Sequence, residues 1–255
     1  MALKRQLWKP PFADFPSWSC PACEFGTLAL MEGSLTIVET GRSEESKRHD
    51  AWEPTWKDER FIAMLVCNNV NCKESVAACG RTRHVDDHDY ERQELNWARL
   101  FQPTFLAEAP PVFPIPEHCP HEIKRELMQA FSVMWSDVGL SANRLRSAIE
   151  ALLDQQKIQK TTVQSSGRRV RLTLHRRIGV FRNKNADAAR SLEAVKWLGN
   201  VGSHASLDAL TIDDLLDGFE LFEHAIDRVY IRREEQLRKL AKVINKQKGK
   251  RRHSR

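Results

Sequence analysis

Prolines are concentrated in one stretch of the chain, and they restrict what that stretch can fold into. Residues 102–120 contain six of the 11 prolines in the 255-residue sequence. Proline lacks a backbone N–H donor and fixes φ, so such a run cannot continue a helix or a central strand. The sequence therefore predicts a junction between two domains in this stretch, which we place between residues 112 and 113.

The first predicted domain, residues 1–112, is rich in short runs of β-forming residues. Residues 27–31 and 34–39 flank a Glu-Gly pair, a pattern typical of a β-hairpin. Residues 60–67 and 74–79 are further strand candidates. We therefore expect a small β-rich module with several turns.

Two polar stretches interrupt this β-rich region. Residues 41–59 lack apolar periodicity and are expected to form an exposed loop. His84 and His88 lie in the run HVDDHDYE, four residues apart, and on a helix they would share one face with the neighbouring carboxylates. This spacing indicates either a divalent-metal site or, more commonly, a solvated acidic face.

Four of the six cysteines form two close pairs, one with two intervening residues and one with four. They are Cys20, Cys23, Cys67 and Cys72. Four thiolates at turns beside strands are a usual ligand set for tetrahedral zinc, and metal binding adds folding energy to a small β region. Because four sulfur ligands leave no open coordination position, the predicted zinc is structural. Free thiols are the alternative interpretation, which we expect to hold for Cys79 and Cys119.

The second predicted domain, residues 113–245, shows helical periodicity. Residues 121–138 place apolar side chains three and four positions apart, at Ile123, Leu127, Ala130, Phe131 and Met134. Ser141 is expected to cap the next helix, and residues 172–181 and 186–197 predict two more. Together the two parts predict an α+β protein, with a zinc-ribbon-like β module followed by a helical bundle.

The last predicted helix begins at a capping pattern. Thr211-Ile-Asp-Asp214 resembles a capping box in which Asp replaces the usual Glu, and the helix is expected to continue through Leu240. The final segment, residues 246–255, is too charged and too poor in apolar residues to pack, so we expect a basic disordered tail.

Charge is distributed very unevenly. Residues 231–255 hold 11 Lys+Arg and 2 Asp+Glu, and residues 157–184 hold nine Lys+Arg without a carboxylate. The other 202 residues carry 20 basic and 32 acidic side chains, so the formal charge of +6 is the sum of an acidic body and two cationic segments. Cations suited to the phosphates of RNA or DNA lie in the segment 157–184, at Arg168, Arg169, Arg171, Arg176 and Arg177. A solubilising surface is the alternative interpretation. The basic tail is expected to bind any polyanion weakly and with steep salt dependence.

Three stretches of the second domain carry a family resemblance. Residues 141–153 contain Arg146 and Glu150 in an Arg-x-x-x-Glu arrangement, and a basic connector containing glycine leads into residues 172–181. Residues 197–204 contain Asn200 and His204 in a Gly-Asn-x-x-x-His arrangement. Residues 120–230 thereby resemble the helical family called domain of unknown function 4145, which is grouped with the HEPN (higher eukaryote and prokaryote nucleotide-binding) superfamily.

The resemblance implies a helical bundle that pairs as a homodimer, behind an N-terminal zinc ribbon, with a role in RNA handling or prokaryotic antiviral defence. In the ribonucleases of that superfamily an Arg precedes the Asn, whereas this chain has Gly199. We therefore expect a nucleic-acid-associated protein with little or no catalysis. The alternative is a metal-independent ribonuclease acting through Arg146, Glu150, Asn200 and His204.

From the residues alone, the same positions have a structural interpretation. Gly199 and Asn200 can form a C-terminal helix cap, and Arg146 and Glu150, one helical turn apart, can form an ion pair. A protein–protein adaptor is a third hypothesis for function. Few cysteines, no apolar run of about 20 residues and no apolar leader segment predict a cytoplasmic protein that does not cross a membrane.

Overall fold

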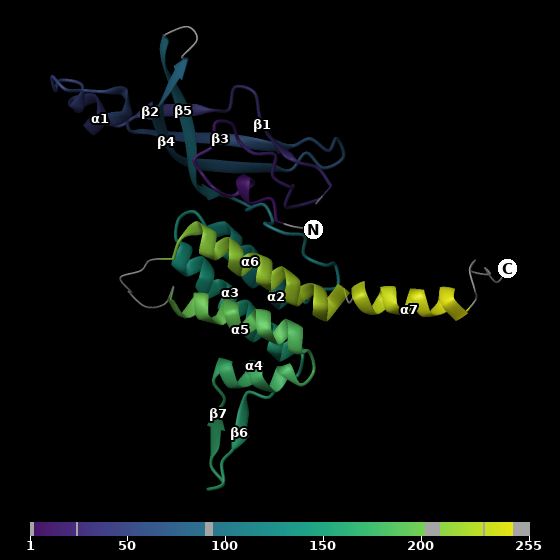
Figure 1. The fold of residues 1–255 in the computed structure, drawn as a ribbon. Helices are drawn as coiled ribbons and strands as arrows, with labels where there is room; N and C mark the ends of the chain where they lie inside the picture. The colour runs from purple at the N-terminus through teal and green to yellow at the C-terminus, as the bar shows by residue number, and fades with distance from the viewer. Residues whose placement is uncertain (1–2, 24, 90–93, 202–209, 232, 247–255) are drawn as a thin grey trace.

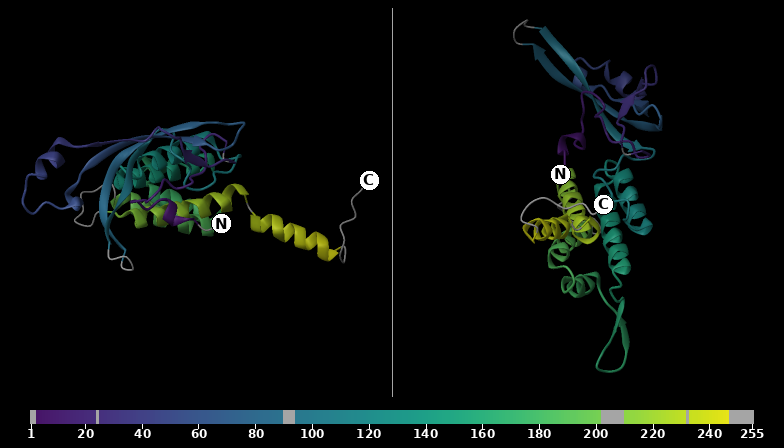
Figure 2. Two further views of the ribbon diagram at one scale, coloured as in Figure 1. Left: turned by 90° about the horizontal axis from the view of Figure 1, so that it is seen from above. Right: turned by 90° about the vertical axis from the view of Figure 1, so that its right-hand side faces the viewer.

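A computed structural model describes residues 3–23, 25–89, 94–201, 210–231 and 233–246. An antiparallel sheet occupies the N-terminal part of the chain and helices occupy the C-terminal part, so the predicted α+β class is confirmed. The sheet lies against one end of the helical bundle, and a small hairpin projects from the opposite end (Figures 1 and 2). The predicted boundaries at 112 and 245 remain predictions, and residues 247–255 of the expected tail lie outside the described residues.

The described residues form a five-stranded sheet in which β3 is paired on both sides. Its strands are β1 (Leu28–Leu30), β2 (Thr36–Glu39), β3 (Glu59–Cys67), β4 (Ser75–Asp89) and β5 (Glu94–Leu106). Burial along β3 alternates residue by residue, as expected when only one face of a sheet is packed. The strand predicted at residues 60–67 is confirmed.

The hairpin predicted between residues 27 and 39 is wrong. β1 and β2 do not pair with each other but follow one another along the same edge of β3, with Leu30 opposite Leu65 and Thr36 opposite Ile62. The Ser34 hydroxyl supports the continuous alignment, because it accepts the Met64 N–H at 3.1 Å and donates to the Met31 carbonyl at 2.7 Å, with the Met64 carbonyl 3.1 Å away. A side chain thus replaces the backbone partner that the loop between β1 and β2 lacks.

The acidic run containing His84 and His88 belongs to the long strand β4, so the helical arrangement considered for it is wrong. β4 pairs with β5 along most of its length, and the two form a ribbon that extends beyond the rest of the sheet (Figure 1). Pro103 lies within β5, which shows that the proline-rich stretch does not exclude a strand at its start. β5 is an edge strand, and a register shift at Gly80 accommodates Pro103, whose Cα would lie 2.8 Å from a Cβ at Gly80.

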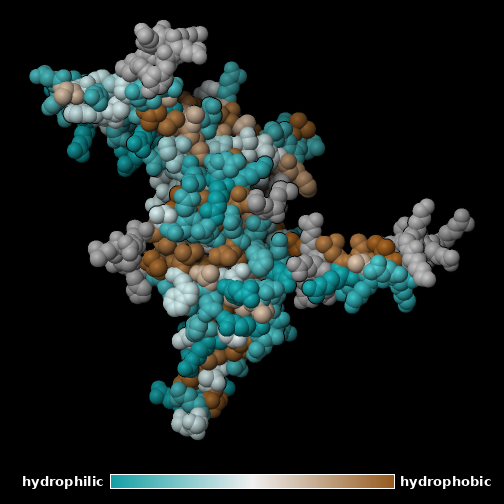
Figure 3. Space-filling model, viewed as in Figure 1, coloured by the Kyte–Doolittle hydropathy of each residue, from teal (hydrophilic) through white to brown (hydrophobic). Residues whose placement is uncertain are grey.

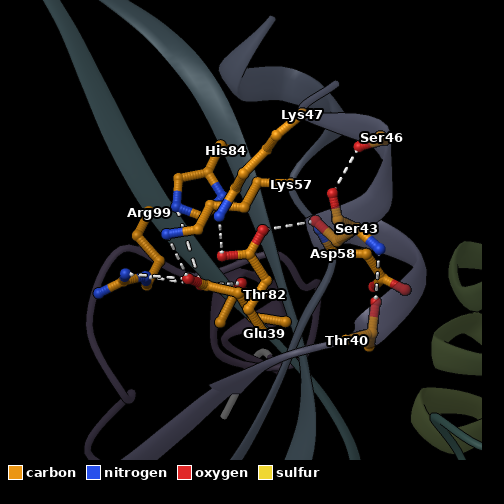
Figure 4. A network of polar contacts seen from close by, with 11 residues as sticks. Glu39, Thr40, Ser43, Ser46, Lys47, Lys57, Asp58, Thr82, His84 and Arg99 are labelled. Carbon is orange, nitrogen blue, oxygen red and sulfur yellow. Dashed lines mark hydrogen bonds and ion pairs between the residues drawn. The ribbon is translucent and has the colours of Figure 1, made fainter. Parts of the chain in front are cut away.

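Short helices occupy the segment expected to be an exposed loop. They are α1 (Gly41–Ser46) and the 3-10 turn η2 (Pro54–Trp56). The segment is tied to the sheet by a polar network in which Ser43 donates to Glu39 at 2.8 Å and Lys47 pairs with Glu39 at 2.6 Å (Figure 4). These side-chain bonds order a stretch that has no apolar periodicity of its own.

Helices after residue 120 form the second half of the molecule. They are α2 (His121–Val133), α3 (Val138–Gln155), α4 (Leu174–Arg182), α5 (Ala186–Val201), α6 (Ile212–Ile226) and α7 (Arg233–Lys246), with a π-turn η3 (Asp227–Ile231) between the last two. The apolar stripe predicted for α2 is buried throughout. α7 projects from the bundle, with an apolar edge that includes the exposed Leu237 and Ile244 (Figure 3).

The two predicted helix caps have different outcomes. Thr211 accepts the Asp214 N–H and Asp214 accepts the Thr211 N–H, so the capping box before α6 is confirmed. Ser141 does not cap α3. Asp137 caps it by accepting the Leu140 N–H at 2.8 Å, and Ser141 lies buried within the helix, where its hydroxyl donates to the Ala130 carbonyl of α2.

The N-terminal segment joins the two halves. Trp8 and Trp18 pack with Trp135, which follows α2, and the Trp135 indole N–H donates to the Trp8 carbonyl at 3.0 Å. On the surface, Arg5 pairs with Glu220 of α6 at 3.0 Å. The sheet and the bundle therefore share one apolar core at their contact.

Candidate functional site

The four cysteines predicted as metal ligands come together beside the end of β3. Cys67 is the last residue of β3 and Cys72 lies in the following turn, whereas Cys20 and Cys23 lie in the loop before β1. The four Sγ atoms lie within 4.8 Å of one another, with Cys20 and Cys72 3.8 Å apart and Cys23 and Cys67 3.7 Å apart. This arrangement is compatible with a metal site. Cys79 and Cys119 are not part of the group.

The spacing of the sulfur atoms fits a single tetrahedral ion. Four sulfurs at about 2.3 Å from a zinc ion lie about 3.8 Å apart when the angles are tetrahedral. The Cys20–Cys72 and Cys23–Cys67 distances match that edge length, and all four sulfurs lie within 4.8 Å of one another. The residues present therefore fit a closed four-thiolate centre.

Hydrogen bonds between the two cysteine loops fix this geometry. The Thr27 N–H donates to Asn68 Oδ1 and the Asn68 N–H donates to the Thr27 carbonyl, both at 2.9 Å. Gly26 lies between the loops, where a Cβ would overlap the sulfur of Cys67. Glycine is thus the only residue that lets the backbone pass this close to the ligands.

Backbone N–H groups also point at the sulfurs. The Gly26 N–H donates to Cys23 Sγ at 3.4 Å and lowers the pKa of Cys23 to about 6. Burial raises the pKa of Cys67 to about 12, although the Asn69 N–H donates to its sulfur. A cation bound among the four sulfurs would favour the thiolate form of each.

A second polar group lies where α3 and α5 pack closely. α5 continues to Val201, so the helix end predicted at 197 and the interpretation of Gly199 and Asn200 as a C-terminal cap are wrong. A Cβ at Gly199 would lie 2.9 Å from the Arg146 Cβ and 3.0 Å from the Ala142 carbonyl oxygen. Gly199 is the contact point of two helices, which leaves no room for a larger side chain.

The structure brings together two of the four polar residues that the resemblance selects. Arg146 donates to the side-chain oxygen of Asn200. The expected ion pair between Arg146 and Glu150 is absent from the described structure, because the Arg146 guanidinium is directed toward α5 instead. His204 lies outside the described residues.

A lysine close to this group is buried, which the sequence did not predict. Lys196 is 4% exposed, and its Nζ lies 3.3 Å from the centroid of the Trp197 ring and 3.4 Å from His175 Nδ1. Burial lowers the pKa of Lys196. The available signal is its place in the apolar stripe of α5, next to the buried Val195.

Beside Arg146 a cleft of about 410 Å³ opens between α3, α4 and the segment that joins them. Five charged side chains line it, namely Arg146, Glu150, Lys160, Arg171 and Arg177. The residues that begin α4 form another part of the wall. The cleft thus unites residues from the Arg-x-x-x-Glu motif and from the basic connector.

The basic connector folds as a β-hairpin. It consists of β6 (Thr161–Val163) and β7 (Arg169–Arg171), with Gly167 at a φ of +77° in the turn. The hairpin projects from the bundle at the end away from the sheet (Figure 1). Arg169 and Arg171 therefore lie on a strand, and Arg168 lies in the turn before it.

Four of the five arginines proposed for nucleic-acid contact are exposed, and none of the four has an ion-pair partner among the described residues. They are Arg168, Arg169, Arg171 and Arg176. Arg177 differs, because it is 5% exposed and donates to Asp154 at 2.6 Å. Arg177 is a buried part of the fold and does not belong to the exposed surface formed by the other four arginines.

Comparison with known proteins places two family models on the chain. Residues 128–247 match the model described as Domain of unknown function (DUF4145), and residues 12–106 match that described as Domain of unknown function (DUF8608). The likeness to the first family, expected from three motifs, is confirmed. No curated protein and no solved structure matches the chain. Within the described residues no helix has the length and apolar content of a membrane span.

Proposed function

We propose that this protein binds nucleic acid, with RNA as its first candidate ligand, through the β6–β7 hairpin and the adjoining face of α4. One observation carries the proposal. Arg168, Arg169 and Arg171 are exposed on the hairpin and Arg176 is exposed on α4, and none of the four has a carboxylate partner among the described residues. Unpaired guanidinium groups on such a surface suit the phosphate backbone, which dominates affinity for nucleic acids.

The proposal is one of binding rather than cleavage. Gly199 occupies the position that resembles the catalytic arginine position of HEPN ribonucleases, and it is packed against α3. No guanidinium can enter there without separating the two helices. A preorganised cation at a phosphate under attack usually contributes orders of magnitude in rate.

Zinc is the ion we propose for the four cysteines, and its role is to hold the sheet. Support comes from the all-sulfur ligand set and from separations of 3.7 and 3.8 Å, which match a tetrahedral edge. One ligand loop precedes β1 and the other follows β3, so one ion would cross-link the adjoining ends of two paired strands. When bound, zinc supplies cross-linking energy and no open position for a substrate.

The remaining parts of the proposal follow from the family resemblance. They are a HEPN-like bundle behind a zinc ribbon, a homodimer, a cytoplasmic location, and a role in RNA handling or antiviral defence. Light scattering of the purified protein tests the dimer. An adaptor that docks a protein on its acidic body is the competing hypothesis, and the absence of bound nucleic acid after gentle purification would favour it.

A titration of the full-length protein with single-stranded RNA tests the binding function. Arg168→Ala/Arg169→Ala should weaken binding at 50 mM salt, and it should reduce the slope of log affinity against log salt by about 0.7 for each phosphate that the variant no longer neutralises. The matched control is Arg42→Ala/Arg48→Ala, which removes the same charge from exposed positions beside the sheet. Equal affinity of all three proteins would contradict the proposal.

A further inference from the structure

The cleft between α3 and α4 has a strong excess of positive charge. Arg146, Lys160, Arg171 and Arg177 line it, and Glu150 is the carboxylate among its charged lining residues. The next carboxylate, Asp154, is shared by two of these cations, at 2.7 Å from Lys160 and 2.6 Å from Arg177. The cations therefore outnumber the carboxylates around the cleft by four to two, which favours an anionic ligand.

Arg177 gives an independent indication of a ligand. Its side chain is 6% exposed, and its Nη2 donates to Asp154 and to the Ile158 carbonyl. Its Nε, by contrast, is buried and has no hydrogen-bond partner among the described residues. Buried N–H donors in folded proteins are almost always paired. Arg177 also forms part of the cleft wall, so this unpaired donor lies beside the space that a ligand would occupy.

The start of α4 adds a third feature to the same wall. Leu172, Thr173 and Leu174 line the cleft, and Thr173 caps the helix by accepting the Arg176 N–H at 3.3 Å. The first N–H groups of a helix have no partner within the helix, and the helix dipole places partial positive charge there. Helix N-termini of this kind bind phosphate groups.

We propose that this cleft binds a phosphate monoester, presented either by a free nucleotide or by the phosphorylated end of a strand. A volume of about 410 Å³ holds more than a bare phosphate ion and falls in the range of small-ligand pockets. Glu150 accepts hydrogen bonds from hydroxyl groups, which suits a sugar beside the phosphate. Binding of a phosphorylated strand end rests on the proposed nucleic-acid function, whereas binding of a free nucleotide does not.

Calorimetry on the full-length protein tests the site with three small probes: inorganic phosphate, adenosine 5′-monophosphate and adenosine. We expect saturable binding of the first two and none of adenosine. The source of the phosphate is then tested with one oligoribonucleotide prepared with a 5′-phosphate and with a 5′-hydroxyl. Preference for the 5′-phosphate identifies the strand end as a ligand.

Two variants distinguish a direct effect on binding in the cleft from an effect of misfolding. Arg171→Ala should weaken the binding of adenosine 5′-monophosphate at least tenfold, which is the usual effect of removing a charged hydrogen bond. Glu150→Gln removes a negative charge from the cleft and should increase the affinity for inorganic phosphate by about threefold. A misfolded protein cannot give tighter binding, so the second variant supports the site independently of the first.

The outcomes distinguish the two proposals. If RNA binds with no preference for a 5′-phosphate and adenosine 5′-monophosphate does not bind, the cleft proposal is overturned and the proposed function stands. If adenosine 5′-monophosphate binds but RNA does not, the proposed function is overturned and the cleft is a nucleotide site. Arg168→Ala/Arg169→Ala should weaken RNA while leaving adenosine 5′-monophosphate binding unchanged.

Discussion

The helical half and the sheet half of this molecule are stabilised by different kinds of contact. In the helical half, neighbouring helices pack through apolar stripes that leave side chains such as Leu152 and Leu192 fully buried. In the sheet half, only one face is packed, and Val38 and Ile62 are 60% and 61% exposed. The sheet half buries less apolar surface for its size and depends on specific polar and sulfur contacts between distant residues. We expect the two halves to respond very differently to the removal of a single side chain.

The largest effect is expected at the cysteines. Cys20→Ser should abolish zinc binding and unfold the sheet half, because structural zinc contributes on the order of 10 kcal/mol to small zinc modules. Hydrogen exchange should show reduced protection in β1 and β3, with smaller changes in α3 and α5. Metal analysis of the same samples should give one zinc per chain in the wild type and none in the variant.

Cys79→Ser is the matched control, since Cys79 is half-buried and lies outside the four-sulfur group. It should keep its zinc and its protection pattern. A wild-type protein that is folded without metal would remove zinc from the proposal. Uniform loss of protection in both halves would instead show that the difference between the halves is too small to separate them.

A polar network in the sheet half should produce the next largest effect. Glu59 is 3% exposed and accepts hydrogen bonds from Thr82 at 2.7 Å and Arg99 at 2.9 Å, while Lys57 lies 2.8 Å away. These three partners are labelled in Figure 4. Burial alone would raise the pKa of Glu59, but the bonds from Lys57, Thr82 and Arg99 outweigh it and lower the pKa to about 2. A folded-state pKa below the unfolded value stabilises the protein above about pH 4.5, and this stability is lost as pH falls toward 2.

Glu59→Gln tests this linkage. The variant should be less stable than the wild type by about 3 kcal/mol at pH 7, the free energy of a shift from 4.5 to about 2. The gap should close as the pH falls below about 4.5. Acid also protonates zinc-bound thiolates, so the informative quantity is the difference between the two proteins in denaturant titrations at each pH. A gap that stays constant with pH would assign the loss to packing rather than to charge.

The contrast between the halves also explains what can be predicted from sequence. Helical periodicity is local, so the stripe of α2 and the capping box at Thr211 are predictable from residues within one or two turns. The course of β1 and β2 depends on Ser34 bonding to Met64, 30 positions away, and no local pattern reports such a contact. The proline rule fails at Pro103 for the same reason, because the accommodating residue, Gly80, lies on another strand.

The candidate sites follow the same division. The cysteine group is predicted completely, since ligand type and close pairing are properties of the sequence. Four of the residues that line the cleft are predicted as site residues, namely Arg146, Glu150, Arg171 and Arg177. Lys160 and Thr173 are not, because they become wall residues only once the connector folds as a hairpin. The charge of Arg177 suggests an exposed side chain. Its partner Asp154 lies on a different helix, and Arg177 is the buried member of this ion pair.

Packing between α3 and α5 gives a smaller expected effect, confined to the helical half. Gly199→Ala places a Cβ 2.9 Å from the Arg146 Cβ and 3.0 Å from the Ala142 carbonyl, so the helices must separate slightly. Overpacking of this kind usually destabilises by about 1–3 kcal/mol. Gly179→Ala, on α4 where a Cβ meets no neighbouring atom, is the control and should be neutral or stabilising. A stable Gly199→Ala protein would show that α3 and α5 can move apart easily.

The smallest effect is expected at helix N-caps, of which we compare one from each half of the molecule. Thr211→Ala removes the hydroxyl that accepts the Asp214 N–H and should destabilise the helical half by about 1 kcal/mol. Thr40 makes the same bond to the Ser43 N–H at 3.3 Å, but α1 has six residues and lies at the margin of the sheet. Thr40→Ala should therefore change global unfolding less than Thr211→Ala. Equal losses of stability for the two variants in urea unfolding would show that α1 is a cooperative part of the fold, and that the sheet half depends on its loops as strongly as on its metal centre.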